Sequence, residues 1–274
     1  MAKVRVLPQV LAHQIAAGEV IERPASVVKE LVENALDAEA TQIHVYVEEG
    51  GKRILRVTDD GHGMSAEDAK LAFVHHATSK IVDFDDLMDI RTLGFRGEAL
   101  PSIASVARVT LRTVDSEGPT DGSPLGTEIA YAAGELRESR EITWPRGTEV
   151  TVEDLFYNVP ARRKFLKTVA TELSHISRLV MCYALAFPGV EFRLTHQNKS
   201  LIEAPSVENP GDRIFQLMGD SLTQNLVPME YSVEGVAVSG FTSLPHEQRN
   251  GANGLYLFVN RRMVRDRVLT HAIR

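Results

Sequence analysis

The segment from Pro24 to Asp37 constrains the fold more than any other, because it pairs an apolar face with a strip of acids and one amide. At about 100° per residue, a helix gathers its apolar side chains on one side. That side holds Val28, Leu31, Val32 and Ala35. The opposite side, at spacings of three and four, holds Glu30, Glu33, Asn34 and Asp37. We therefore predict an amphipathic helix that begins at Pro24 or Ser26 and ends near Asp37.

The acidic strip of this helix suits a cation. A solvent-facing strip is the plainer interpretation of a lone helix, but these acids repel one another and no lysine or arginine on the strip compensates them. The carboxylate of Glu30 can take a proton from water. The amide oxygen of Asn34, one turn later, can ligate Mg²⁺, which takes few protein ligands and completes its shell with phosphates and water. This pair of residues therefore indicates nucleotide hydrolysis.

Around this helix the first half of the chain alternates between helical and strand-like patterns. We predict helices over residues 11–17 (with Gly18 as the stop), from about residue 65, and over 98–106. We predict strands around 43–47, 55–59, 109–114, 128–132 and 149–152. Residues 49–52 and 60–63 are expected to form tight turns. Residues 78–97 are expected to form a long, mobile loop, and 115–126 an exposed connection.

The second half of the chain carries the best candidate for a domain boundary, at Ala204–Asp212, where Pro, Gly and Asn cluster. A helix is predicted before it, over 171–187, and strands after it, near 233–241 and 255–259. A last helix is predicted to start near Asp266. We therefore expect two domains, at residues 1–205 and 206–274. Because the chain stops at Arg274 inside that helix, we expect the second domain to be truncated.

Composition limits the compartment and the class of partner. The 274 residues have a net charge of −7, which argues against a general DNA-coating protein but allows a local basic patch. Cys182 is the only cysteine, so no internal disulfide or cysteine zinc cluster can form. No apolar stretch is long enough to span a membrane, and the N-terminus lacks the pattern of a signal peptide. We expect a cytoplasmic, intracellular protein without a membrane partner.

Three further patterns point to a nucleotide. Asp59 lies at a predicted strand end before a loop with glycines at 61 and 63, and its carboxylate is suited to the exocyclic amine of adenine. The run from Leu93 to Leu100 carries two glycines ahead of a helix start, which favours an anion site. The run from His76 to Lys80 offers hydroxyls and an ammonium to phosphates. Neither a Walker A loop nor a dinucleotide-binding glycine triplet is present, so an ordinary P-loop NTPase is excluded.

Taken together, these residues resemble the Bergerat-fold ATPases, a superfamily that includes DNA gyrase B subunits, heat-shock chaperone ATPases, histidine kinases and the MutL family of DNA mismatch repair proteins. The similarity to the MutL family is the greatest. It is carried by residues 14–38, 76–80, 94–100, 154–166 and 259–267. Departures from the family pattern are small: Asp60 replaces a frequent asparagine, and Pro101 replaces a small residue.

The resemblance implies an α+β fold: a two-layer sandwich with a mixed sheet and helices on one face, followed by a second, βαβ-type domain. It implies ATP and Mg²⁺ as ligands, Glu30 as the general base and Asn34 as the Mg²⁺ ligand. Asp37 is expected to support the site. The further nucleotide contacts that it implies are Ala38, Asp59, Gly63, Met64, Thr78, Ser79, Lys80, Leu93, Gly94, Phe95, Arg96, Gly97, Glu98, Ala99, Leu100 and Thr148. The phosphate-contacting lysine of the family's second domain has no match in this chain.

The resemblance also implies partners. ATP would order the 93–100 segment as a lid and drive homodimer formation, and the dimer would act between a MutS-type mismatch recognition protein and a downstream nuclease or helicase. Non-specific DNA contacts are expected at Arg162, Arg163, Arg261, Arg262, Arg265 and Arg267. Two alternatives stay open. The first is a DNA-binding scaffold without catalysis, and the presence of Glu30 and Asn34 argues against it. The second is a gyrase-like ATPase, and the arginine clusters argue against it.

Overall fold

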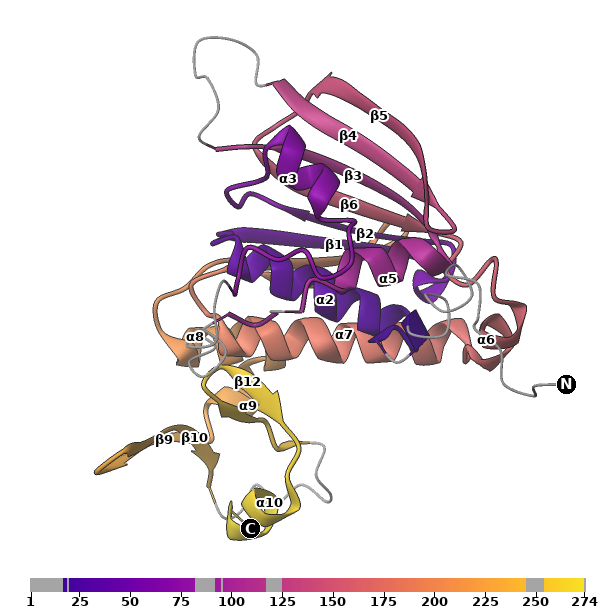
Figure 1. Ribbon diagram of the computed structural model, residues 1–274. Coiled ribbons are helices and arrows are strands. Elements are labelled where there is room, and N and C mark those ends of the chain that lie inside the picture. The colour runs from indigo at the N-terminus through magenta and orange to yellow at the C-terminus, as the bar shows by residue number, and fades with distance from the viewer. Residues whose placement is uncertain are drawn as a thin grey trace, which may run out of the picture.

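The computed structural model describes residues 17–18, 20–81, 92–94, 96–116, 125–244 and 254–273. Its main body has two layers, an eight-stranded sheet and a layer of helices on one face, and a smaller C-terminal part lies below the helices (Figure 1). The α+β sandwich predicted from the sequence is therefore confirmed.

The sheet has the strand order β5-β4-β3-β6-β2-β1-β7-β8. Only the β1–β7 pair is parallel, and the remaining neighbours are antiparallel, so the sheet is mixed. The strands are β1 Gln42–Glu48, β2 Ile54–Asp59, β3 Arg108–Val114, β4 Leu125–Ala132, β5 Glu135–Thr143, β6 Gly147–Glu153, β7 Glu191–His196 and β8 Lys199–Ala204. The short 3-10 helix η1 (Glu49–Gly51) joins β1 to β2.

The helical layer is built on α2 and α7, which pack against each other and against the sheet (Figure 1). Helix α5 lies beside α2 and covers β3 and β4, and α3 lies over β4. The helices of this part are α2 Pro24–Asp37, α3 Ala66–Leu71, α5 Ala99–Val106, α6 Pro160–Phe165 and α7 Val169–Ala186. Proline in the first turn of α2 costs no hydrogen bond, because the first amides of a helix have no partner inside it.

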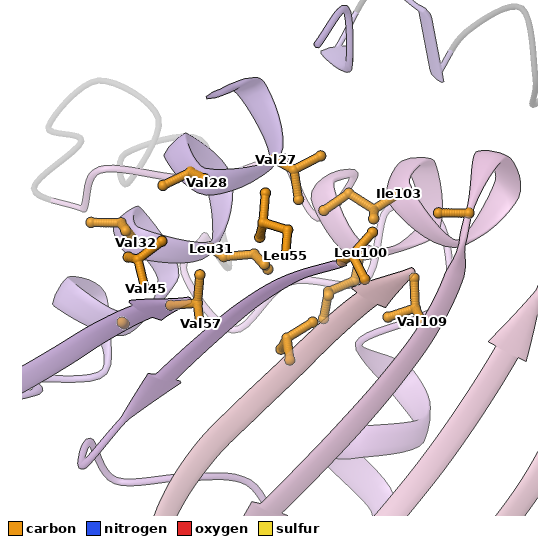
Figure 2. Close-up of a cluster of buried hydrophobic side chains, with 14 of the residues drawn as sticks. Val27, Val28, Leu31, Val32, Val45, Leu55, Val57, Leu100, Ile103 and Val109 are labelled. Atoms are coloured by element: carbon orange, nitrogen blue, oxygen red, sulfur yellow. The ribbon is translucent and has the colours of Figure 1, made fainter. Parts of the chain in front are cut away.

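The core fills the space between these layers. Figure 2 shows the apolar side of α2 (Val27, Val28, Leu31, Val32) facing Val45, Leu55 and Val57 of β1 and β2, with α5 and β3 adding Leu100, Ile103 and Val109. All of these side chains are buried. The period of the helix and the alternation of the strands thus converge on one hydrophobic layer. The consequence for function is that the polar side of α2 is turned away from this layer.

The opposite face of the sheet is polar. Arg112 of β3 lies between Glu128 of β4 and Glu149 of β6, at 2.6 and 2.8 Å, and its guanidinium lies 5.0 Å from the centre of the Trp144 ring. The two carboxylates offset the free-energy cost of placing the Arg112 charge on the sheet surface. Glu128 also forms an ion pair with Arg140 of the edge strand β5.

The C-terminal part begins with two short helices, α8 (Pro210–Met218) and α9 (Asp220–Thr223). Two separate hairpins and a helix follow: β9 (Leu226–Val233) with β10 (Val236–Ser243), β11 (Leu257–Val259) with β12 (Arg262–Val264), and α10 (Arg267–Ile273). Asp266 accepts a hydrogen bond from the Leu269 amide at the start of α10, as expected for a helix that begins there.

Most predicted elements are confirmed to within a few residues, and four expectations are wrong. Strands β5, β7, β8 and β12 and helices α6, α8 and α9 were not predicted. Gly18, predicted to stop the first helix, is itself helical, as is Val20. A single strand predicted at 233–241 spans the turn between β9 and β10. The predicted linker at 204–212 includes the end of β8 and the start of α8. The helix expected at 11–17 lies mostly outside the described residues, as do much of the 78–97 loop and most of the 115–126 connection.

Candidate functional site

The polar side of α2 is partly neutralised by a lysine. Lys29 Nζ lies 3.0 Å from Glu30 Oε1 and 2.9 Å from Glu33 Oε2, so the expectation that no cation compensates these acids is wrong. Burial by itself would lower the pKa of Lys29, but the two carboxylates outweigh it and raise that pKa. Tyr183 of α7 donates to Glu33 Oε1 at 2.7 Å. Glu33 is therefore occupied in holding α2 to α7, whereas Glu30 has a single ion pair among the described residues.

One turn further along, a cation already lies on the amide predicted to ligate metal. Lys80 Nζ donates to Asn34 Oδ1 at 2.9 Å and to Asp37 Oδ2 at 2.6 Å. Only 7% of the Asp37 side chain is exposed, so its charge is poorly screened by water. The oxygens of these two residues thus form a place that accepts positive charge. This position fits Mg²⁺, because an amide oxygen and a nearby carboxylate are ligand types that it uses.

Asp37 also fixes the start of the glycine loop. Its two carboxylate oxygens accept from the Leu93 amide at 2.8 Å and from the Gly94 amide at 3.0 Å. Thr92 Oγ1 donates to the Gly94 carbonyl at 2.7 Å and tightens the same turn. The loop therefore begins directly beside Asn34 and Lys80, with peptide N–H groups turned toward the acidic end of α2. Asp37 therefore links the end of α2 to both Lys80 and the start of the loop.

Asp59 ends β2 and carries a buried carboxyl group. It accepts hydrogen bonds from the amides of Gly61, at 3.0 Å, and Thr148. Burial raises its pKa from 3.8 to about 6, with a smaller upward contribution from Asp60, and the two amide hydrogen bonds only partly offset this. A buried carboxylate of this kind is short of donors, and an amine from a ligand would stabilise its charged form.

Glycines surround Asp59 where side chains would not fit. A Cβ at Gly61 would lie 2.6 Å from the Ala38 carbonyl oxygen, and one at Gly147 would lie 2.1 Å from the Asp59 carbonyl oxygen. Gly63 has φ +68, and a Cβ there would lie 1.9 Å from the Val114 carbonyl oxygen. These contacts hold the 60–63 turn tightly against the C-terminal end of α2, as the amide of His62 donating to the Ala38 carbonyl at 3.0 Å confirms.

Two threonine hydroxyls complete the Asp59 region. Thr148 pairs with Asp59 across β2 and β6, and its Oγ1 lies 3.0 Å from Thr113 Oγ1 of β3. Thr113 Oγ1 is also within hydrogen-bonding distance of the Met64 amide, at 2.9 Å. Sequence reasoning missed Thr113. The available signal was its place on the same side of β3 as Val109 and Leu111, where a hydroxyl is unusual.

The glycine loop leads into α5 at Glu98. Its carboxylate pairs with His75 and His76, each at 2.7 Å. Gly97 has φ +62, and a Cβ there would lie 2.3 Å from the Ala77 carbonyl oxygen, so the loop packs closely on the 76–80 run. The Lys80 amide donates to Thr78 Oγ1 at 3.1 Å. The two runs predicted to contact phosphates therefore lie side by side, and Ala99 and Leu100 form the first turn of α5.

The structure thus brings several of the predicted nucleotide contacts together around the C-terminal end of α2. Their contacts link Asn34, Lys80, Leu93 and Gly94 on one side, and Ala38, Asp59, Gly63, Met64 and Thr148 on the other. Glu30 lies one turn earlier on α2, and Thr78, Gly97 and Glu98 belong to the two runs that pack on each other. Ser79 and Arg96 are not placed by these contacts. Phe95 lies outside the described residues. Within the described parts of the chain, no group of three or more His, Cys, Asp or Glu side chains is arranged to hold a metal ion.

The predicted DNA-binding arginines lie in two places. Arg163 is exposed on α6, whereas the guanidinium of Arg162 lies against Gly18, where a Cβ would meet it at 1.6 Å. Arg265 and Arg267 are exposed at the start of α10. Two others contact the main body: Arg261 lies over the Phe187 ring, 5.6 Å from its centre, and Arg262 donates to carbonyls of the glycine loop.

Comparison with known proteins agrees with this arrangement. Residues 21–121 match the family described as histidine kinase-, DNA gyrase B-, and HSP90-like ATPase, and residues 214–274 match DNA mismatch repair protein, C-terminal domain. The chain is 48% identical over 297 residues to the DNA mismatch repair protein MutL of Acidobacterium capsulatum, covering 100% of this chain and 44% of that protein. It is 49% identical over 271 residues to MutL of Geobacter sulfurreducens, covering 99% and 44%.

Solved structures show the same similarity. The Aquifex aeolicus MutL ATPase domain complexed with ADP has 32% sequence identity and a TM-score of 0.72, and the match covers 92% of this chain and 87% of that one. The chain spans less than half of the length of the curated relatives that it matches. Among the helices of the described residues, none has the length and apolar character needed to cross a lipid bilayer.

Proposed function

The chain belongs to the MutL family of DNA mismatch repair proteins, and from this premise we propose that it binds ATP at the C-terminal end of α2 and hydrolyses it slowly. The observation that carries the proposal is the Lys80 ammonium on Asn34 and Asp37, with the Leu93 and Gly94 amides beside it. A cationic group and backbone N–H groups converge there on one small region, and the phosphates of a nucleoside triphosphate need such donors.

Asp59 is proposed to read the adenine base. Its buried carboxylate would accept a hydrogen bond from the exocyclic amine, which guanine does not present at that position. Met64 would lie against the base, and Thr148 would add a hydroxyl contact. The ADP complex of the Aquifex aeolicus relative supports an adenine nucleotide as the ligand class. Gly61 and Gly63 pack against the Ala38 and Val114 carbonyls, where side chains would not fit, and so keep the 60–63 turn in place next to Asp59.

The phosphates are proposed to lie between the 78–80 run and the glycine loop. Lys80 would move from Asn34 and Asp37 onto phosphate oxygens, and the amides of residues 93–94 and 96–100 would wrap the same group. Asn34 would be the protein ligand of Mg²⁺, which when bound neutralises the phosphate charge. The Leu93 and Gly94 amides would exchange the Asp37 carboxylate for phosphate oxygens beside it, so these two donors would have a short way to move.

Glu30 is proposed as the general base. Its carboxylate would take a proton from the water whose oxygen attacks the terminal phosphorus, and the bond from that phosphorus to the ADP oxygen would break. Lys29 holds Glu30 at 3.0 Å in the structure. That hydrogen-bonded ion pair fixes the position of the carboxylate on the polar side of α2.

The output is proposed to be conformational. ATP would order the glycine loop as a lid, and the ordered lid would favour a homodimer, which hydrolysis would release. In this form the protein would act in the cytoplasm between a MutS-type mismatch recognition protein and a downstream nuclease or helicase. DNA would be held non-specifically through its phosphates, with Arg163, Arg265 and Arg267 as candidates, because Arg261 and Arg262 contact the main body.

Substitution of the base tests this proposal. Glu30→Gln is expected to bind ATP–Mg²⁺ about as well as the parent while losing hydrolysis by roughly two orders of magnitude or more. Glu67→Gln, an exposed glutamate on α3, is the matched control and is expected to hydrolyse ATP normally. Light scattering with ATP should show the Glu30→Gln dimer persisting. Normal hydrolysis by Glu30→Gln would show that Glu30 is not the general base. If the parent neither binds nor hydrolyses ATP, the proposed ATPase function is wrong and the non-catalytic DNA-binding scaffold is the alternative that stands.

A further inference from the structure

The hairpin of β11 and β12 brings an arginine from the C-terminal part to the nucleotide site. Its two-residue turn is Asn260-Arg261, with φ values of +49 and +64, as in the type I′ turns that fit a right-handed strand twist. Arginine is rarely found in this left-handed conformation, so the turn is held by its surroundings. The residue that follows it, Arg262, begins β12.

The hairpin is docked on the main body rather than free. Figure 1 shows β12 directly beneath α7, and the two elements are in contact. Arg261 lies over the ring of Phe187, which caps the C-terminal end of α7, at 5.6 Å from the ring centre. A cation over an aromatic face is attracted by it, which helps to seat the turn. The docking sets where the next side chain can reach.

Arg262 reaches the first residues of the glycine loop. One of its guanidinium nitrogens donates to the Thr92 carbonyl oxygen at 2.6 Å and lies 3.2 Å from the Leu93 carbonyl oxygen. The amides of Leu93 and Gly94 donate from the other side of the same segment to Asp37. The Thr92–Gly94 segment is therefore held by two side chains. Arg262 donates hydrogen bonds to its carbonyls, and Asp37 accepts hydrogen bonds from its amides.

From this geometry we infer that Arg262 is a positioning residue for the nucleotide site, and that it links the placement of the C-terminal part to the start of the phosphate-binding loop. The inference rests on the proposed function. It reassigns Arg262, which the sequence grouped with the DNA-binding arginines, because its guanidinium is spent on loop carbonyls. Arg265 and Arg267 make no contact of this kind with the loop in the described residues.

A charged donor is suited to this role. Thr92 and Leu93 are part of a bend, so their carbonyls have no strand or helix partner among the described residues. With Arg262 present, the segment stays beside Asn34 and Lys80, and the loop amides remain where phosphates are proposed to bind. Without it, Asp37 alone holds the segment, and ordering the loop around a nucleotide would cost more conformational entropy.

The test compares Arg262→Met, which keeps a long side chain but removes the donor, with the parent. Hydrogen exchange of a peptide covering residues 92–94 is expected to speed up severalfold in the nucleotide-free protein, because the Leu93 and Gly94 amides lose part of their protection. The affinity for ATP–Mg²⁺ is expected to fall about tenfold, whereas that for adenosine should not change. Arg137→Met is the matched control, since that exposed arginine also contacts a backbone carbonyl, that of Ala132.

Arg262→Lys keeps the charge on a shorter stem and should recover only part of the ATP affinity. Unchanged exchange at residues 92–94 together with unchanged ATP affinity in Arg262→Met would overturn the inference. So would a DNA salt slope lowered by about one unit with nucleotide binding intact, which is the behaviour of a phosphate ligand. A parent that binds no ATP would instead defeat the proposed function, and the exchange measurement would still report on Arg262.

Discussion

Replacing Asp59 by asparagine removes a carboxyl group whose pKa is brought near neutrality by burial. With a pKa of about 6 in the nucleotide-free protein, about nine tenths of Asp59 is charged at pH 7 and about one tenth at pH 5. An adenine amine binds the charged form, so the bound state keeps Asp59 ionised. The affinity of the parent for an adenine nucleotide is therefore expected to fall about tenfold between pH 7 and pH 5.

The same substitution is expected to stabilise the protein. The folded state raises the pKa of Asp59 from 3.8 to about 6, which costs up to about 3 kcal/mol of unfolding free energy at neutral pH. For an acid whose pKa is raised on folding, this cost is present above pH 6 and disappears as the pH falls toward 3.8. Asp59→Asn should thus raise the melting temperature at pH 7.5, with a gain that shrinks as the solution is acidified.

Two measurements check this reasoning. Calorimetric titration from pH 5 to 8 should give a smaller pH dependence of nucleotide affinity for Asp59→Asn than for the parent. Comparing the two proteins cancels the protonation of the nucleotide phosphates, which titrate in the same range. Thermal unfolding should show the variant to be more stable at pH 7.5. The reasoning would be refuted if the nucleotide affinity of both proteins depended equally on pH, or if the variant were less stable than the parent at pH 7.5. Either result would mean that Asp59 is not a carboxylate with a raised pKa that binds the base.

Two other substitutions separate the remaining roles. Asn34→Ala is expected to lose the Mg²⁺-dependent part of ATP affinity, measured with and without Mg²⁺ by equilibrium dialysis; an unchanged Mg²⁺ effect would contradict a ligand role. The double variant Arg265→Glu with Arg267→Glu is expected to lower the slope of log DNA affinity against log salt by about two, with ATP hydrolysis in the absence of DNA nearly unchanged. An unchanged slope would shift attention to Arg163.

The sequence predicted the part of the fold whose periodicity reports burial. α2, β1 and β2 each pair apolar and polar residues at a clean helical or strand period, and each was found. β5 was missed because it is an edge strand whose residues are nearly all exposed, so it carries charges at most positions and no apolar alternation. β7 and β8 were missed because their apolar positions are few and lie between a helix and a Pro-rich run.

The site residues with distinctive chemistry could be predicted from the sequence. The contacts between residues far apart in the chain could not. Glu30, Asn34 and Asp59 stand out by type and spacing. Lys29 was overlooked although it precedes Glu33 by four residues, the spacing at which side chains on a helix meet, and it pairs with both Glu30 and Glu33. The carbonyl contacts of Arg262 join residues about 170 positions apart, which no local pattern reveals.

Arg213 offers the sharpest test of the predicted linker, because its hydrogen bonds hold the residues on both sides of that linker in place. It lies in α8 with 0% of its surface exposed, and its Nη2 donates to the carbonyls of Pro188, Val190 and Pro205 at 2.7, 2.9 and 3.0 Å. The chain on both sides of 205–209 is therefore tied to the end of α7 and the start of β7, although Pro, Gly and Asn in the sequence suggested freedom.

Arg213→Met keeps the apolar stem and removes the donor to the carbonyls of Pro188, Val190 and Pro205, of which the Pro188 carbonyl keeps the Val207 amide as a partner. The expected loss of unfolding free energy is about 2–4 kcal/mol, the scale of several hydrogen bonds from one charged donor. Urea unfolding measures it, and Arg193→Met, an exposed arginine on β7, is the control. Limited proteolysis should also become faster within 205–209. A loss below about 0.5 kcal/mol, within the range of ordinary surface substitutions, would restore the free linker that the composition suggested.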